Sequence, residues 1–250
     1  MATYLDNIVA AHRAYPEPVA SDADLAAAPA PRDFDGALRG GLNVIAEIKR
    51  RSPSMGDLNP DLDPSLIAKA YAEGGAAALS VLTDTEFFGG SVADLQAARA
   101  AVDAPVLRKD FTVCEADVRY ARAIGADAVL LIVAALSDDE LGRFHRLATD
   151  LGMAALVEVH DEDELARAFA AGARIVGVNQ RDLKTFAVDH ERALRMAESL
   201  REVVSVAESG VRDAADARRL RDAGYDAILV GQTVVTAGDP AEMVRSLRCS

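Results

Sequence analysis

The sequence is poor in cysteine and histidine and has no long hydrophobic run. Its two cysteines, Cys114 and Cys249, show no metal-ligand spacing and form no disulfide framework, which fits a reducing compartment. The four histidines are scattered and no HExxH motif occurs, so we expect no bound metal. No apolar run reaches the ~18 residues that span a bilayer, and the first residues lack the basic and apolar parts of a signal peptide.

Basic residues are also in short supply. The chain has 27 lysines and arginines against 40 aspartates and glutamates, a net charge of −13. A surface that binds nucleic acid or anionic lipid needs an excess of positive charge. We therefore expect a cytoplasmic protein without nucleic-acid or membrane partners, as a monomer or a weak homo-oligomer.

What the sequence does contain is one pattern repeated eight times. A short, β-branched apolar run is followed by a turn, an Ala-rich amphipathic stretch and a glycine. The runs lie at 44–49, 77–82, 105–109, 127–133, 154–159, 174–179, 203–208 and 226–231. Nearly continuous apolar runs are typical of parallel strands covered by helices, and eight units in about 205 residues favour an α/β fold of the (β/α)8 TIM-barrel type. The alternative, an open doubly wound sheet, should carry a GxGxxG motif after the first strand, and none follows it.

Helices are predicted between these strands, for example at 64–74, 115–125, 161–172 and 213–224. Each has apolar residues three and four apart, acidic residues near its start and a glycine at its end, where a left-handed cap is expected.

The first 43 residues do not follow the repeat. Residues 4–15 predict a helix, and residues 16–32, with four prolines, predict a loose connection. We expect the whole chain, 1–250, to form one barrel domain, with the barrel at 44–248. Residues 1–43 would be a helical extension that packs on the barrel as a lid or plug; a mobile tail is the alternative.

Charged side chains stand at the ends of the predicted strands. In a TIM barrel these ends converge on one mouth. Alternate residues of a strand face the same side, so Glu47 and Lys49 should both point into the barrel. Two lysines and up to three glutamates would then share one cavity, in which Lys109 stays protonated while a carboxylate acts as base. A structural ion-pair layer is the alternative. The strand ends carry Glu47, Lys49, Lys109, Asp110, Glu158, Asn179, Arg181, Glu208 and Ser209.

The loops after the seventh and eighth strands of a TIM barrel commonly bind phosphate. Here Ser209–Gly210 and Gly231–Gln232 would present backbone N–H groups to an anion. The basic loop KRRSPS at 49–54 would contribute as well; a solvated charge run or a nuclear localisation signal is its alternative interpretation.

Two phenylalanines follow the second and third strands. Phe88 and Phe111 are expected to form apolar walls for a planar substrate, to pack on the N-terminal helix, or both. Cys114 lies near the predicted mouth with no histidine beside it in the sequence, so we expect it to take no part. His160 is expected at the rim or as a helix cap rather than as a base.

The motifs VIAEIKRRSPSMG, FFGGS, VLRKDF, ADAVLLIV, LVEVH, GVNQRDL, VAESGV and LVG follow one another in the order that resembles indole-3-glycerol-phosphate synthase. The resemblance covers about residues 42–240, and the N-terminal helix also fits the family. AEIKRxSPS, KDF and NxRDL are specific to it, whereas ESG and LVG also suit other phosphate-binding barrels.

The resemblance implies a carbon–carbon lyase (carboxy-lyase) of tryptophan biosynthesis. Its substrate would be 1-(2-carboxyphenylamino)-1-deoxyribulose 5-phosphate, which closes to indole-3-glycerol phosphate with loss of CO2 and water. The family needs no cofactor and no metal. The absence of tryptophan from the chain agrees with this function but decides nothing.

The resemblance also implies residue roles. Lys109 would protonate the ribulose carbonyl, and Glu158 would exchange protons during proton removal and dehydration. Glu47 and Lys49 would complete the acid/base and carboxylate-binding set. Asn179 would bind a substrate hydroxyl, and Arg181 would contact the anthranilate end. Ser52, Gly210 and Gly231 would bind the phosphate, with Ser209 at the same rim. Glu208, Phe88 and Phe111 would also contact substrate. Gln232 stands where the family often has serine, so its backbone N–H rather than its side chain is the expected ligand.

Two other functions remain open from the residues alone. A Schiff-base aldolase would use Lys109 or Lys49 as its nucleophile, but such a lysine needs a depressed pKa, whereas neighbouring carboxylates raise it. A pseudoenzyme that only binds a phosphorylated ligand would not need the full set of lysines, glutamates and asparagine.

Overall fold

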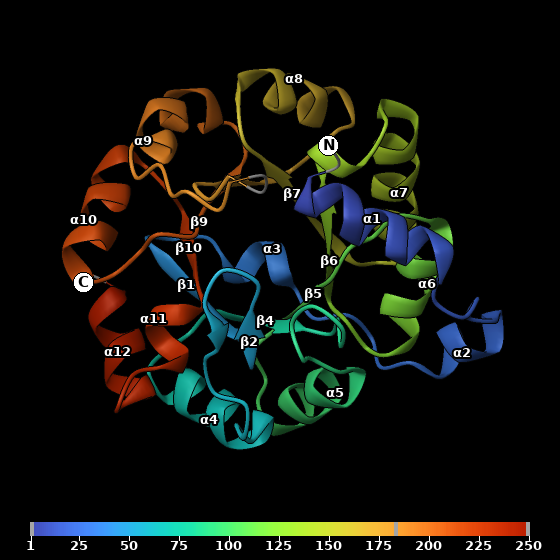
Figure 1. Cartoon of the computed structure of the whole chain (residues 1–250), viewed down its shortest axis with the longest axis horizontal. Coiled ribbons are helices and arrows are strands. Elements are labelled where there is room, and N and C mark those ends of the chain that lie inside the picture. Colours follow the sequence, from blue (N-terminus) through green and yellow to red (C-terminus); the bar gives the residue numbers. More distant parts are fainter. Residues whose placement is uncertain (1–2, 183–184, 249–250) are drawn as a thin grey trace.

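The centre of the protein is a closed barrel of eight parallel strands (Figure 1). The computed structural model describes residues 3–182 and 185–248, so Cys249 and Leu183 of the NxRDL motif lie outside it. The strands are β1 (Asn43–Ile48), β4 (Ala78–Leu82), β5 (Val106–Lys109), β6 (Ala128–Ile132), β7 (Ala154–Val159), β8 (Ile175–Asn179), β9 (Val204–Glu208) and β10 (Ala227–Val230). β1 pairs with both β4 and β10, which closes the ring. The TIM-barrel prediction is confirmed, and the open-sheet alternative is wrong.

Helices follow the strands and surround the barrel (Figure 1). They are α4 (Pro64–Glu73), α5 (Val92–Ala101), α6 (Glu115–Ala123), α7 (Asp138–Asp150), α8 (Glu162–Ala170), α9 (Arg192–Met196), α10 (Ala214–Ala223), α11 (Gln232–Val235) and α12 (Pro240–Leu247), with 3-10 helices η1 (Val133–Ala135) and η2 (Ala197–Leu200). The glycines after α6, α8 and α10 are left-handed as predicted, but after α4 that residue is Gly75, with φ +86°, because Gly74 still has helical angles. No helix among the described residues combines the length and the hydropathy needed to cross a membrane.

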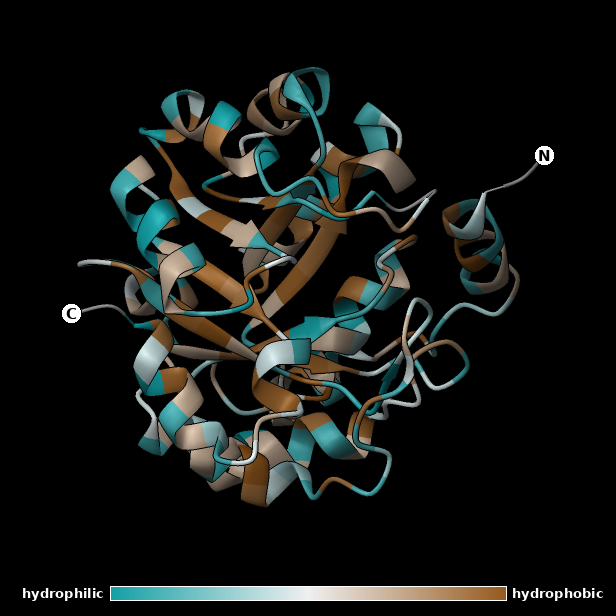
Figure 2. Cartoon of the chain, turned by 60° about the vertical axis from the view of Figure 1, so that its left-hand side comes forward, coloured by the Kyte–Doolittle hydropathy of each residue, from teal (hydrophilic) through white to brown (hydrophobic). Residues whose placement is uncertain are grey.

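The barrel separates two apolar layers. Along β1, Val44, Ala46 and Ile48 pack in the layer between strands and helices, whereas Ile45 packs inside the barrel. In Figure 2 the strands are mostly hydrophobic, whereas the helices mix hydrophobic and hydrophilic residues. This alternation sends Glu47 to the inside, as the sequence predicts.

The N-terminal extension covers both ends of the barrel. Helix α1 (Tyr4–Ala14) crosses one side of the opening, and its Leu5 and Ile8 line the cavity there (Figure 1). Helix α3 (Phe34–Ala37) lies near the centre of the ring, and Phe34 and Leu38 pack into the barrel interior. The extension is thus a lid and a plug, and the mobile-tail alternative is wrong.

The predicted loose connection at 16–32 is wrong in part, because it contains helix α2 (Asp22–Ala27). Ser21 and Asp24 form a capping box at its start, but the helix has six residues and buries none of them. Such a short helix without a buried residue has no apolar periodicity to detect. Between α1 and α2, Glu17 binds Arg108 of β5 at 2.5 Å.

Candidate active site

A cavity of about 370 Å³ opens at the carboxyl ends of the barrel strands, beneath α1. Every site residue predicted from the sequence lies on its wall: Glu47, Lys49, Ser52, Phe88, Lys109, Phe111, Glu158, Asn179, Arg181, Glu208, Ser209, Gly210, Gly231 and Gln232. Apolar residues of the strands, such as Leu130, Ile132 and Leu229, complete the wall. The cavity is therefore apolar around a compact group of charges.

Lys109, the last residue of β5, lies between two buried carboxylates. Its Nζ is 3.0 Å from Glu158 Oε2 on β7 and 3.6 Å from Glu208 Oε2 on β9. Burial alone would lower the pKa of Lys109, but the negative charges around it, those of Glu158 and Glu208 first, raise it. Lys109 is therefore an ammonium group held in a cavity where water cannot screen its charge well.

The two carboxylates beside Lys109 have opposite pKa shifts. Burial would raise the pKa of Glu158, but the charge of Lys109, then His160 and the hydrogen bond from Asn179, lower it. Burial raises the pKa of Glu208, and the negative charge of Glu158 adds to the effect against the opposing charge of Lys109. The two carboxylates thus differ in acidity, with Glu158 the more readily ionised and Glu208 keeping its proton to higher pH, an arrangement that proton-transfer sites use to provide both a base and an acid.

A second pair of charges lies on β1 and in the loop that follows it. Lys49 Nζ is 2.5 Å from Glu47 Oε1, and Ser80 of β4 donates to Glu47 Oε2 at 3.4 Å. A Cβ atom at Gly231 would overlap Glu47 Oε1. The glycine at the end of β10 thus leaves the space that the Glu47 carboxylate occupies.

Asn179 and Ser209 connect Glu158 to the next two loops. Asn179 Nδ2 donates to Glu158 Oε1 at 3.1 Å, and Ser209 Oγ donates to Asn179 Oδ1 at 2.8 Å. Ser209 and Gly210 both have left-handed backbones, with φ +65° and +77°. This turn aims Ser209 back at Asn179 and brings Gly210 to the cavity wall.

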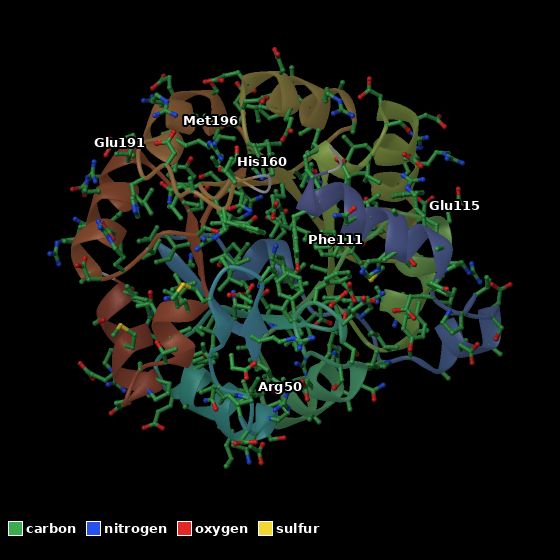
Figure 3. All side chains as sticks on the ribbon, viewed as in Figure 1. Arg50, Phe111, Glu115, His160, Glu191 and Met196 are labelled. Carbon is green, nitrogen blue, oxygen red and sulfur yellow. The ribbon has the colours of Figure 1, made fainter. Side chains whose placement is uncertain are left out.

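The prediction that the basic loop 49–54 contributes to the site agrees with the structure only for some of its residues. Lys49 and Ser52 line the cavity, but Arg50 makes a two-point ion pair with Asp94 and lies towards α4 and α5 (Figure 3). Arg51 donates to the backbone carbonyl of Thr85. These arginines hold neighbouring loops together, so the two alternative interpretations of the loop, as a solvated charge run or a localisation signal, are not supported.

Phe88 and Phe111 both line the cavity, and Phe111 also packs on α1 as predicted, whereas their role as walls for a planar substrate stays a prediction. Their ring centroids are 6.4 Å apart on the cavity wall, and Phe111 also lies 5.4 Å from the ring of His12 on α1 (Figure 3). The sequence interpretation missed several lining residues: Tyr4, Leu5, Ile8, Phe186, Val188, His190 and Arg212. Leu5 and Ile8 are three residues apart and lie on one face of α1. This spacing predicts a helix, but it does not show that these two residues line the cavity.

Asp110 points to the edge of the cavity, towards α1. It accepts a hydrogen bond from Arg108 at 2.9 Å, and His12 lies 3.8 Å from it and 2.9 Å from Asp84. Among the described residues, the possible metal ligands gather at His12, Asp84 and Asp110. Their atoms are already hydrogen-bonded to one another, to Arg108 and to backbone N–H groups, so the group acts as a fastening for α1.

Two residues near the mouth lie outside the cavity wall. Cys114 precedes α6 and is partly buried, and burial raises the pKa of its thiol, which agrees with a group that takes no part. His160 follows β7 and lies beside Glu158, with its ring bonded to Glu164 of α8 (Figure 3).

The sequence profile described as indole-3-glycerol phosphate synthase matches residues 2–247. The chain belongs to this family. It is 54% identical over 233 residues to the indole-3-glycerol phosphate synthase of Micrococcus luteus, covering 90% of this chain and 87% of the relative. It is 53% identical over 252 residues to that of Nocardioides sp., covering 97% of both. The indole-3-glycerol-phosphate synthase resemblance of the sequence is confirmed.

Solved structures outside this family share the barrel. 3-Hexulose-6-phosphate synthase from Salmonella typhimurium is similar with a TM-score of 0.65 at 16% identity, over 83% of this chain and 97% of that one. Thiamine phosphate pyrophosphorylase from Pyrococcus furiosus is similar with a TM-score of 0.63 at 20% identity, over 83% and 94%. At these identities the likeness shows the fold alone.

Proposed function

We propose that this chain converts 1-(2-carboxyphenylamino)-1-deoxyribulose 5-phosphate to indole-3-glycerol phosphate, CO2 and water, the step of tryptophan biosynthesis that gives its family a name. The observation that carries the proposal is the Lys109 ammonium between Glu158 and Glu208 in a largely apolar cavity. Family membership and relatives at about 50% identity support the same activity.

Ring closure needs a strong acid beside the ketone. The ring carbon that bears the carboxylate attacks the ribulose carbonyl carbon, and Lys109 donates its proton to the carbonyl oxygen. A preorganised ammonium in a dry cavity stabilises the charge that develops on that oxygen. The carboxylate then leaves as CO2, and the electrons of its bond restore the aromatic ring.

Dehydration needs both an acid and a base. The new hydroxyl leaves as water with a proton, and Glu158 removes a proton from the neighbouring carbon so that the indole double bond forms. Glu47 and Lys49 complete the acid/base set on the other side of the cavity and bind the substrate carboxylate. Asn179, which already bonds to Glu158, holds a substrate hydroxyl.

The two ends of the substrate fit different parts of the wall. The phosphate lies against Ser52, Gly210 and the backbone of Gly231 and Gln232, with Ser209 at the rim. The anthranilate ring lies between the apolar walls of Phe88 and Phe111, next to Arg181 and Glu208.

The aldolase alternative is disfavoured by the charges. A lysine that forms a Schiff base must lose its proton, and Lys109 is surrounded by carboxylates that raise its pKa. Lys49 is held in an ion pair with Glu47, with its Nζ 2.5 Å from Glu47 Oε1.

The test is incubation of the protein with the carboxyphenylamino-deoxyribulose phosphate while indole fluorescence is followed. Fluorescence should appear, and Lys109→Ala should lower kcat by two or more orders of magnitude, the scale of a general acid. Lys69→Ala, on the exposed side of α4, is the matched control and should keep full activity. Tight binding without fluorescence would indicate a pseudoenzyme, and borohydride trapping of a lysine adduct would indicate an aldolase.

We further propose that the chain is a single barrel domain with an extension at 1–43, that it is cytoplasmic, and that it is a monomer or a weak homo-oligomer. It would require neither a cofactor nor a nucleic-acid partner. The net charge of −13 supports the absence of a nucleic-acid partner, and the packing of the extension at both barrel ends supports a single domain.

A further inference from the structure

His160 is a partly buried histidine, and only one of its two ring nitrogens has a hydrogen-bond partner among the described residues. Its Nδ1 is 3.0 Å from Glu164 Oε2, and the same oxygen accepts the backbone N–H of His160 at 2.8 Å. A carboxylate only accepts hydrogen bonds, so Nδ1 carries a proton. The other ring nitrogen, Nε2, is therefore the atom whose protonation decides the charge of the ring.

That second nitrogen faces the active site. Within the part of the chain that the structure describes, Nε2 is buried without a hydrogen-bond partner, and it lies 3.7 Å from Glu158 Oε1. A neutral imidazole would aim a lone pair at a buried carboxylate, whereas an imidazolium would aim an N–H at it. Burial alone would lower the pKa of His160, but Glu164 and Glu158 raise it against the opposing charge of Arg192 on α9.

The contact between His160 and Glu158 bears on the proton transfers of the proposed reaction. While Lys109 is charged, it favours ionisation of Glu158, which is the closer of its two carboxylates. Once Lys109 has donated its proton, its share of that preference is lost while the hydrogen bond from Asn179 remains, so the proton of Glu208 can move to Glu158 more readily. A positive charge on the side of Glu158 that faces away from Lys109 would prevent this transfer.

We propose that His160 is a positioning residue that keeps the negative charge of the Glu158–Glu208 pair on Glu158 after Lys109 has given up its proton. Its influence reaches the substrate only through Glu158. The inference rests on the proposed function, in which Glu158 is the base.

The first test reports on His160 without using the reaction. In protein labelled with ¹³C at histidine Cε1, the resonance missing from His160→Gln identifies His160. We expect it to titrate above 6.5, the ordinary value, and to titrate at lower pH in Glu158→Gln. Titration at or below 6.5, or no response to Glu158→Gln, would overturn the proposal.

The second test is the pH profile of kcat. In the native chain kcat should fall about tenfold as the pH rises through the titration of His160, because an opposite charge within 4–6 Å shifts a pKa by about one unit or more. His160→Gln should stay at the lower level throughout that range, with an unfolding midpoint close to that of the native chain. A reduction that is equal at all pH values would mean that His160 has only a structural role.

The control for both tests is His145→Gln on α7, because burial lowers the pKa of His145 and its charged neighbours are Arg146 and Arg174. It should leave the kcat profile and the His160 titration unchanged. Absence of ring closure in the native chain would count against the proposed function and leave the NMR result to decide the charge of His160.

Discussion

At the scale of the residue, the site consists of lysines and glutamates whose charges compensate one another. Their types and their places at strand ends are readable from the sequence, because a charge in an apolar run must face a shared interior. The opposite shifts in the pKa of Glu158 and Glu208 are not readable, because they depend on which carboxylate lies nearer to Lys109 and which accepts the hydrogen bond of Asn179.

Gly177 of β8 is expected to be essential for the placement of Glu208. A Cβ at this position would overlap Glu208 Oε1, and the buried side chain has little room to move. Gly177→Ala should therefore lower kcat about 100-fold, the cost of a small misplacement of a reacting group. Steady-state kinetics measure this effect. Gly142→Ala in α7, where the new atom meets only the end of Arg146, should keep native activity.

The protonated state of Glu208 should appear in the pH dependence of stability. Because the pKa of Glu208 is raised from 4.5 in the folded chain, the folded state binds the proton more tightly than the unfolded state. Its contribution to stability is complete below pH 4.5 and is lost as the pH rises through the folded pKa. Urea unfolding measures how much the free energy of unfolding decreases between pH 6 and pH 9. This decrease should be smaller in Glu208→Gln than in the native chain, by at least about 1 kcal/mol. The exposed Glu202→Gln should behave like the native chain.

At the scale of the element, strands were easier to predict than the segments that cover them. All eight barrel strands have apolar runs that burial on both faces requires. Helix α2 escaped prediction because it buries nothing, and the covering role of α1 depends on contacts with residues distant in the chain. The roles of Arg50 and Arg51 were hidden for the same reason, since their partners, Asp94 of α5 and the Thr85 carbonyl, are distant in the chain.

The fastening of α1 by His12 is expected to weaken at high pH. Burial lowers the pKa of His12, but Asp84 and Asp110 more than compensate and raise it. The stabilisation is therefore complete below pH 6.5 and disappears as the pH rises through the folded pKa. Hydrogen-exchange protection factors of α1 amides should fall over this range, whereas those of α12 should not. His12→Gln should have weak protection at every pH; an unchanged α1 would contradict the prediction.

At the scale of the whole molecule, the barrel has one open end and one closed end. The cavity and its charges occupy the carboxyl ends of the strands, and Phe34 with Leu38 fills the interior away from them. The barrel and its mouth were predictable because eight repeats leave few other arrangements. A lid or plug was predicted for the extension, but Phe34 was not identified as part of it, because Phe34 belongs to a helix of four residues with no pattern of its own.

Phe34→Ala should destabilise the molecule without changing its chemistry. The side chain is 1% exposed, and removal of a buried phenylalanine costs about 3–5 kcal/mol. Urea unfolding should show this loss, while kcat of the folded fraction stays native. Phe169→Ala is the matched control, because Phe169 on α8 is 41% exposed, and it should change stability by less than about 0.5 kcal/mol. A loss of kcat at full folding would show that the two ends are coupled.

The distribution of the charges over the ring has a consequence for fragments. A cut between β5 and β7 would leave Lys109 on one piece and its partners Glu158 and Glu208 on the other. Neither piece would hold the complete set of acid and base groups. Each piece alone should therefore be inactive, and catalysis would require both pieces in one reassembled barrel.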